Sequence, residues 1–487
     1  MEHVDVLIVG AGLSGIGAAW HLQDRCPGTS YAIWEARDAI GGTWDLFRYP
    51  GIRSDSDMFT LGYRFKPWLE KRAIADGASI LRYVRETARE NGIDRNIRFG
   101  HKVVAAHWNA ADAVWEVEAE TPQGRVTIRA GFVLMCSGYY SYDEGHRPEW
   151  PGEADFEGRL VHPQFWPADL DYTGKRVVVI GSGATAVTLV PEMAKAAAHV
   201  TMLQRSPTWV LSMPAEDKFA NLTRRTLGAK LSYFLTRWRK VGLQMLFYRM
   251  TRKRPEKVKE HLLGMTRAAL GPDYDVETHF TPRYNPWDQR LCLIPDEDLF
   301  ASLRDGRASV ATDTIERFEA DGIRLASGAK LDADIVVTAT GLKLNVLGDV
   351  AFDRDGVPVD LGKALIYKGM MVGNVPNLAF VFGYTNASWT LKADLTSEYV
   401  CRLINHMKSR GLRVATPRPQ PGITEEPFLD FSSGYVQRAL DKLPKQGNVK
   451  PWKLYQNYAL DLVTLRYGKL EDGTMEFSGV GFVKEAA

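Results

Sequence analysis

Residues 156–167 have the sequence Phe-Glu-Gly-Arg-Leu-Val-His-Pro-Gln-Phe-Trp-Pro, and the rest of the chain is organised on either side of them. The segment fits the spacing F-x-G-x-x-x-H-x-x-x-W-P, with the histidine at position 162. Aromatic residues, a glycine and a rigid proline suit a linker packed between domains better than a regular helix or strand. An ordinary packed loop with a surface histidine would have the same composition. However, an apolar run followed by closely spaced glycines occurs both before and after the segment, which favours a joint between two similar domains.

The first of these runs opens the chain. Apart from Asp5, residues 4–9 are apolar and mostly β-branched, as in a buried parallel strand, and lead into Gly10, Gly12 and Gly15. In a dinucleotide-binding turn the first glycine permits the tight turn, the second lets a pyrophosphate approach, and the third lets the helix pack closely. A second strand, residues 30–34, ends at Glu35, where an acid would bind ribose hydroxyls. Strand, glycines, helix, strand and acid in this order predict a nucleotide site.

A second glycine-rich segment follows, with Gly41, Gly42, Thr43 and Trp44. Consecutive glycines allow a bulky flat ligand to approach the backbone, and a tryptophan supplies an apolar wall. Arg53 and Asp55 come shortly afterwards. They could form an ordinary surface ion pair, or they could act at the cofactor site that the glycines predict.

The middle of the chain repeats the first pattern. The apolar run 176–180 leads into Gly181 and Gly183, with Ala186 in the third position, where the dinucleotide fingerprint tolerates alanine. The next strand, residues 200–204, ends in Arg205 and Ser206 instead of an acid. An arginine there suits a 2′-phosphate and favours NADPH over NADH, although Arg205 could also be a solvated charge at the end of a strand.

A basic helical segment separates the two halves of the second domain. Ten lysines and arginines and no acid fall between residues 224 and 254. Apolar residues recur there at helical spacing: Leu227, Leu231, Phe234, Trp238, Val241 and Met245. We expect a helical insertion with a solvated basic face. Weak peripheral contact with an anionic membrane and steering of an anionic cofactor are alternatives.

The strands after the insertion predict an α/β fold with two Rossmann-like domains. Residues 334–341 form an apolar run with a small-residue turn, which resembles residues 132–138. We predict that residues 1–150 and 339–487 form one domain and that residues 151–210 and 286–338 form the other. Residues 211–285 would be the helical insertion.

Composition argues against a nucleic-acid-binding protein, a dithiol redox enzyme and a membrane-spanning protein. The 487 residues are 45% hydrophobic and 25% charged, with a formal net charge of +2, which argues against a nucleic-acid partner. The four cysteines form no C-x-x-C pair, which favours reduced thiols in the cytoplasm and excludes the common dithiol redox motif. Glycines or prolines interrupt the two long uncharged runs, residues 6–23 and 369–391, so neither is typical of a membrane span.

Taken together, these motifs resemble the type I Baeyer–Villiger monooxygenases, which are class B flavoprotein monooxygenases. The resemblance spans essentially the whole chain and is most specific in residues 41–57, 284–293 and 383–395. It implies FAD at the first glycine turn and NADPH at the second. It also implies an O₂-dependent conversion of ketones to esters or lactones through a C4a-peroxyflavin, with oxidation of sulfides as a further activity.

The same resemblance implies the catalytic residues. Arg290 matches the active-site arginine of the family, and Asp55 matches the carboxylate that orients it. A permanently charged guanidinium suits this chemistry because the reaction passes through anions. Many relatives carry a lysine immediately before that arginine, which holds the 2′-phosphate of NADPH. This chain has Gln289 there, so recognition of the phosphate would depend more on Arg205 and Ser206. We predict no metal site, and we expect His162 to set the domain joint and not to transfer protons.

The sequence is also compatible with two other functions. A flavin-containing monooxygenase acting mainly on nitrogen or sulfur centres could use the same scaffold. A non-catalytic, membrane-associated flavin-binding protein would keep the basic helices but would not need Arg290.

Overall fold

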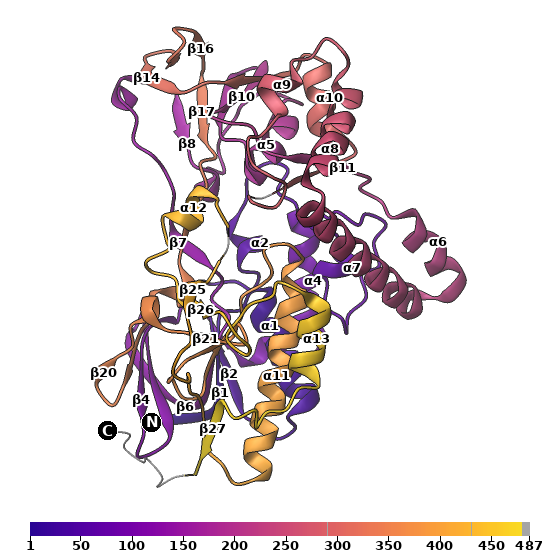
Figure 1. The fold of residues 1–487 in the computed structure, drawn as a ribbon. Coiled ribbons are helices and arrows are strands. Elements are labelled where there is room, and N and C mark those ends of the chain that lie inside the picture. The colour runs from indigo at the N-terminus through magenta and orange to yellow at the C-terminus, as the bar shows by residue number, and fades with distance from the viewer. Residues whose placement is uncertain (290, 430, 480–487) are drawn as a thin grey trace.

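The fold was determined as a computed structural model, which describes residues 1–289, 291–429 and 431–479. The two largest sheets each have a parallel core (Figure 1). In the first, the parallel strands lie in the order β3-β2-β1-β6-β23. Their bounds are β1 (Glu2–Val9), β2 (Tyr31–Trp34), β3 (Ile97–Arg98), β6 (Gly124–Met135) and β23 (Leu378–Phe380). Val9 lies between Trp34 and Met135, so these three strands end together at the edge that carries the first glycine turn.

The long strand β6 extends the first sheet into an antiparallel part. Its first half pairs with β5, while its second half pairs with β1 and β23. The remaining strands of this sheet are β4 (Lys102–Asn109), β5 (Val114–Thr121), β19 (Ala351–Arg354), β20 (Val357–Pro358), β21 (Ile366–Tyr367) and β22 (Met371–Val372). One strand therefore joins the parallel part of the sheet to its mostly antiparallel part, in which β19 and β4 pair in parallel.

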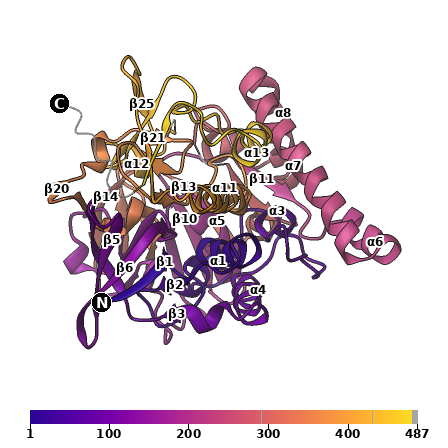
Figure 2. The ribbon, with the colours of Figure 1, turned by 90° about the horizontal axis from the view of Figure 1, so that it is seen from below.

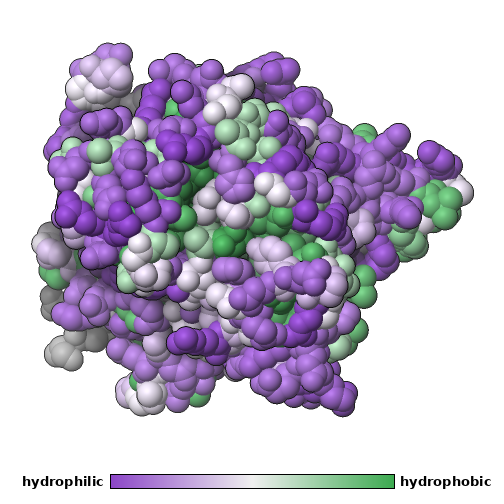
Figure 3. Space-filling view, turned by 90° about the horizontal axis from the view of Figure 1, so that it is seen from above, coloured by the Kyte–Doolittle hydropathy of each residue, from purple (hydrophilic) through white to green (hydrophobic). Residues whose placement is uncertain are grey.

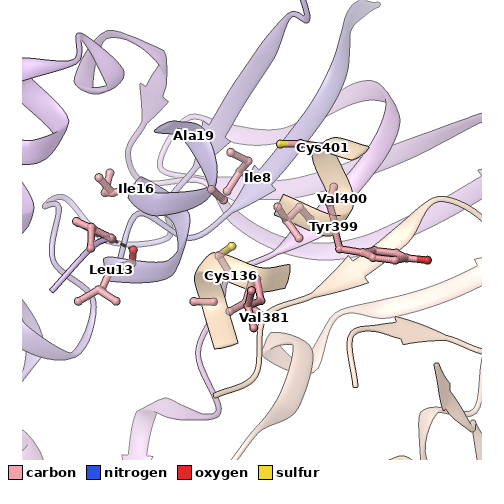
Figure 4. Packing of buried hydrophobic residues seen from close by; sticks show 14 of the residues in the cluster. Ile8, Leu13, Ile16, Ala19, Cys136, Val381, Tyr399, Val400 and Cys401 are labelled. Atoms are coloured by element: carbon pink, nitrogen blue, oxygen red, sulfur yellow. Dashed lines mark hydrogen bonds between the residues drawn. The ribbon is translucent and has the colours of Figure 1, made fainter. Parts of the chain in front are cut away.

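Helices from both ends of the chain pack together on the first sheet. They are α1 (Leu13–Arg25), α4 (Gly77–Glu90), α11 (Trp389–Ser409) and α13 (Tyr458–Arg466). Figure 4 shows Ile8 and Ala19 in the same buried cluster as Val400 and Cys401 of α11. His21 of α1 also lies 3.1 Å from Asp394 of α11, inside the same core. The C-terminal helices thus complete the core that the N-terminal strands begin.

The second sheet is parallel throughout, in the order β13-β10-β9-β17-β8. Its strands are β8 (Arg159–Val161), β9 (Arg176–Ile180), β10 (His199–Gln204), β13 (Ala308–Thr312) and β17 (Ile335–Thr338), and it packs against α5 (Ala184–Met193) and α10 (Asp298–Arg304). A small antiparallel sheet lies beside it, made of β14 (Ile315–Glu319), β15 (Gly322–Leu325) and β16 (Lys330–Asp332). The sequence therefore predicted the fold class, with two Rossmann-like units, correctly.

The connection between the two sheets differs in part from the prediction. The segment 156–167 was expected to be irregular, but residues 159–161 form β8 at the edge of the second sheet. The chain passes between the sheets through a two-stranded ribbon of β7 (Tyr140–Gly145) and β18 (Leu342–Leu344). His162 lies against this ribbon, because a Cβ on Gly145 would come within 2.0 Å of the His162 ring. Burial lowers the pKa of His162, which keeps the ring neutral at neutral pH.

Four helices form the insertion between β11 (Val210–Met213) and β12 (Cys292–Pro295): α6 (Lys218–Leu227), α7 (Ala229–Lys253), α8 (Pro255–Leu270) and α9 (Val276–Phe280). Figure 2 shows α6 and α7 at the edge of the molecule. The apolar stripe predicted for this region is only partly buried: Val241 is buried, whereas Leu231, Phe234 and Trp238 are exposed. No helix in the described part of the chain is both long and apolar enough to cross a bilayer.

Candidate active site

The first glycine turn has the shape that a dinucleotide requires. Gly10 has a φ of +105°, and a Cβ there would lie 2.6 Å from the carbonyl oxygen of Cys136. A Cβ on Gly15 would lie 1.9 Å from the carbonyl oxygen of Gly10, so only glycine fits. Gly12 caps the N-terminus of α1 with no side-chain hydrogen bond, and its Cβ would touch only Gly42 at 3.5 Å. The N-terminal N–H groups of α1 can therefore receive a phosphate.

Glu35 ties this turn to the end of the second strand. One carboxylate oxygen accepts a hydrogen bond from Ala11 N–H at 2.6 Å, and the other accepts one from Arg37 N–H at 2.9 Å. The side chain is almost fully buried, and burial raises its pKa. A carboxylate has about four acceptor sites, so two stay available for ribose hydroxyls.

The second glycine pair faces the first turn across a narrow gap. Gly42 has a φ of +56°, and a Cβ there would lie 3.1 Å from Gly12 Cα. Thr43 begins the short helix α2 (Thr43–Leu46), and its hydroxyl lies 2.6 Å from the hydroxyl of Tyr140. Trp44 follows, packed against the core of the first domain. Both glycines line the same cavity, so a ligand there meets their backbones with no side chain between.

The turn in the second domain repeats this design. Gly181 has a φ of +129°, and a Cβ there would lie 2.4 Å from the carbonyl oxygen of Ala339. Gly183 caps α5 and has nothing within 4 Å of its ideal Cβ position, so this helix end is open as well. Ala186, in the third position, lies on α5 and is fully buried in the core of the second domain.

Arg205 and Ser206 lie beside the second turn. The Ser182 hydroxyl donates to the carbonyl oxygen of Ser206 at 3.2 Å and lies 2.8 Å from the Thr208 hydroxyl. Arg205 is exposed and forms no ion pair among the residues that the structure describes. The guanidinium is therefore available to an anionic ligand that binds at Gly183.

One cavity joins the two turns. Its volume is about 650 Å³, and residues of both domains line it. The predicted site residues in its wall are Gly10, Gly12, Glu35, Gly42, Thr43, Trp44, Asp55 and Gly183. The predicted residues outside the wall are Gly15, Gly181 and Ala186, which shape the turns, and Arg205 and Ser206, which lie beside the second turn. Arg290 lies outside the described residues.

Arg53 lines the same cavity, and it also forms an ion pair that was not predicted. Its guanidinium lies 2.5 Å from the carboxylate of Asp298, at the start of α10 in the second domain. The Arg53 side chain is only 12% exposed, so this ion pair is well shielded from solvent. It links the cavity wall of the first domain to the second domain. This pair could not be predicted from the sequence because 245 positions separate the two residues.

The cavity also has an aromatic wall that was not predicted from the sequence. Tyr139, Tyr140 and Tyr142 line the cavity, and Tyr139 stacks on Trp389 with ring centroids 5.1 Å apart. The indole N–H of Trp389 donates to the Ser14 hydroxyl at 2.8 Å, which fixes the ring over the first turn. Three tyrosines in four positions after the Gly138 turn are the signal that could have predicted this wall.

These features fit a flavin dinucleotide at the first turn. The open N-terminus of α1 suits the pyrophosphate, Glu35 has spare acceptors for a ribose, and the facing glycines and aromatic rings suit a flat ring system. The second turn fits a second dinucleotide by the same reasoning, with Arg205 beside it.

Comparison with known proteins agrees with this geometry. Residues 72–266 match the family described as flavin-binding monooxygenase-like, and residues 8–66 match the NAD(P)-binding Rossmann-like domain. The FAD-containing monooxygenase EthA of Mycolicibacterium smegmatis is 53% identical over 98% of this chain and 97% of its own length. The EthA protein of Mycobacterium tuberculosis is 54% identical over 98% of each chain. The probable FAD-binding monooxygenase AlmA of an Acinetobacter species is 49% identical over 98% of this chain and 96% of its own.

Solved structures share the fold over nearly the full length. An open crystal structure of cyclohexanone monooxygenase has a TM-score of 0.77 at 19% identity, covering 98% of this chain and all of that one. An oxidised steroid monooxygenase bound to NADP has a TM-score of 0.76 at 20% identity, with the same coverage. The two Rossmann-like units, the cavity between them and the identity to EthA lead to one conclusion: the chain belongs to the family of FAD-containing monooxygenases.

Proposed function

We propose that this protein uses NADPH and O₂ to convert ketones to esters or lactones, and that it also oxidises sulfides. The observation that carries the proposal is the single cavity that both glycine turns line. A hydride donor on the second turn and a flavin on the first would share this space with a small substrate. The likeness to cyclohexanone and steroid monooxygenases favours ketones as the substrate class.

The two dinucleotides are assigned to the two domains. Residues 1–150 and 339–487 would hold FAD through the Gly10–Gly15 turn, Glu35 and the Gly42–Trp44 segment. Residues 151–210 and 286–338 would hold NADPH through Gly181, Gly183, Arg205 and Ser206. When bound and reduced, FAD supplies the activated oxygen that is transferred to the substrate.

The protein's own part in the reaction is to hold charge and to exclude water. We assign Arg290, from its place in the motif 284–293, as the cation that stabilises negative charge on the reacting oxygens. Asp55 is half-buried in the cavity wall and is assigned as the carboxylate that orients the guanidinium. The aromatic wall around Tyr139 and Trp389 would keep the reacting groups apart from bulk water.

We also assign the enzyme to the cytoplasm, with weak peripheral contact between residues 224–254 and a membrane. Its partners in the reaction would be small ketones or sulfides and O₂.

The test compares a cyclic ketone with a thioether as substrates of the purified, FAD-loaded protein. Products are identified by mass, and NADPH consumption is followed together with hydrogen peroxide release. We expect ester from the ketone and sulfoxide from the thioether. Sulfoxide without ester would favour the nitrogen- and sulfur-directed alternative, and NADPH consumption unaffected by any substrate would argue against an oxygenase.

The Arg290→Ala variant tests the assigned cation, with Arg283→Ala as the control because Arg283 is exposed in the same segment. Removing a preorganised donor to a developing oxyanion costs about 10²–10³ in rate, so ester formation should fall by at least that factor. FAD should stay bound, because the glycine turns hold it. Ester formation near the wild-type rate would show that the assignment of Arg290 is wrong.

A further inference from the structure

Helix α7 is attached to the first domain by its polar face. The Tyr233 hydroxyl donates to the carbonyl oxygen of Tyr63 at 2.9 Å. The Arg237 guanidinium donates to the carbonyl oxygens of Phe59 and Gly62 at 2.8 and 2.7 Å, and Arg237 is only 5% exposed. A buried guanidinium with carbonyl partners is costly to move, so these bonds fix which face of α7 is turned inward.

The opposite face of α6 and α7 is apolar and exposed. We define the outer face of α6–α7 as Leu222, Leu231, Phe234, Leu235, Trp238 and Leu246. Their exposed fractions range from 37% for Leu235 to 63% for Leu222. Nearly half of the large apolar side chains that are exposed in the described part of the chain lie between residues 219 and 250. Such a concentration on one surface marks an interaction site.

The cations on this segment divide into two groups. Arg239 and Lys240 share the carboxylate of Asp217, and Arg252 pairs with Asp288, so these three cations are partly neutralised. A second group is exposed and forms no ion pair among the described residues: Arg225, Lys230, Arg249, Lys253 and Arg254. Since residues 224–254 contain no acid, the segment that carries most of the outer face is positively charged.

We propose that the outer face of α6–α7 docks on the surface of an anionic phospholipid membrane. The apolar side chains would enter the headgroup region, and the unpaired cations would contact lipid phosphates. Trp238 is of the residue type that prefers this interface. This rests on the peripheral contact proposed above and not on the oxygenation reaction.

The shape and charge of the surface favour a membrane over a second copy of the chain. Figure 1 shows α6 and the adjoining end of α7 projecting from the body of the molecule, and Figure 3 shows apolar side chains at the tip and along one edge of this projection. A projecting apolar edge can enter a soft lipid surface. Two copies packed through this face would bring like charges together, which opposes self-association.

Helix α7, which carries most of the outer face, contacts a segment that lines the cavity. Arg237 binds the carbonyl oxygens on either side of Leu61, and Leu61 lines the cavity. Membrane docking would therefore hold the cavity near a surface in which apolar substrates concentrate.

The test is flotation of the FAD-loaded protein with vesicles of phosphatidylcholine alone or of phosphatidylcholine mixed with phosphatidylglycerol. We expect binding to the mixed vesicles only, and we expect it to weaken as salt rises. A variant with Leu231→Ser, Phe234→Ser and Leu246→Ser should bind at least about tenfold more weakly, because the buried apolar area is lost. Lys230→Gln with Arg249→Gln should weaken binding roughly thirtyfold.

The control variant carries Val357→Ser and Val449→Ser, which are exposed apolar residues elsewhere on the surface. It should bind like the wild type. FAD content and NADPH consumption are measured on the same samples and report on the reaction separately. A protein without oxygenase activity could therefore still bind anionic vesicles. No binding to anionic vesicles, or equal binding by the triple serine variant, would overturn the proposal. If the wild-type protein does not bind vesicles, sediments as a dimer, and the triple serine variant sediments as a monomer, the outer face of α6–α7 would be assigned to contact with a second copy instead.

Discussion

Replacing Glu35 by glutamine should weaken FAD binding while the fold stays intact. The carboxylate accepts hydrogen bonds from Ala11 N–H at 2.6 Å and from Arg37 N–H at 2.9 Å, which leaves acceptor sites for a ribose. Glutamine has nearly the same shape, but its amide nitrogen cannot accept a hydrogen bond. The remaining oxygen can still bind Ala11 N–H, so the glycine turn should persist.

The expected loss follows from the charge of the acceptor. A hydrogen bond to a charged group contributes about 1.5–3 kcal/mol, so losing one to the ribose should weaken FAD binding by roughly one to two powers of ten. In the apoprotein two effects oppose each other. The neutral amide relieves a buried charge, as the raised pKa of Glu35 indicates, whereas Arg37 N–H loses its acceptor. We therefore expect a melting temperature close to that of the wild type.

The assay removes FAD, titrates it back and follows the change in flavin fluorescence, with thermal melting of the apoprotein in parallel. Glu120→Gln, at an exposed position of β5, is the control. If the Glu35→Gln apoprotein is folded and binds FAD as tightly as the wild type, then Glu35 only braces the turn and does not bind the ribose.

Three further predictions concern the two turns and the C-terminal segment. Arg205→Ala should raise the KM for NADPH about 10- to 100-fold and leave that for NADH nearly unchanged, because only NADPH has the 2′-phosphate; equal effects in steady-state assays would contradict this role. Gly12→Ala should fold, since its Cβ meets only Gly42 at 3.5 Å, but it should not take up FAD. Gly15→Ala should lower the melting temperature of the apoprotein itself, since its Cβ would lie 1.9 Å from a carbonyl oxygen. Equal melting temperatures of the two apoproteins would argue against this distinction. Burial alone would raise the pKa of Asp472, but the Tyr367 hydroxyl and the Lys368 ammonium outweigh it, and the pKa lies below the ordinary 3.8. The stabilisation from Asp472 is therefore complete above pH 3.8 and is lost as the pH falls through the lower pKa of the folded state. Asp472→Asn should lower the melting temperature at neutral pH and have little effect in strong acid. A change in melting temperature that does not depend on pH would contradict this prediction.

The parts of the site that the sequence predicted are those set by local geometry. Gly10 and Gly181 have φ values of +105° and +129°, which favour glycine, and such turns have a fixed spacing. Glu35 follows directly from its place at the end of β2. These constraints act within one strand-turn-helix-strand unit, so a single sequence contains all of them.

The parts that the sequence did not predict depend on residues far apart in the chain. Arg53 meets Asp298 only after the two domains pack together. The periodicity of α7 indicated an apolar face, but it could not show that Tyr233 and Arg237 turn this face outward, because their partners lie in residues 59–63. Strand β8 was missed because its three residues lie within a segment rich in proline and aromatic residues.

The packing of α1 against α11 also has a consequence for synthesis on the ribosome. His21 and Asp394 lie 373 positions apart, so at about 5–20 residues per second roughly 20–75 s pass between the synthesis of the two residues. All five strands of the second sheet have been synthesised before α11 begins. The second domain can therefore fold while the apolar surface of α1 still lacks its partner, and during this interval that exposed surface favours aggregation.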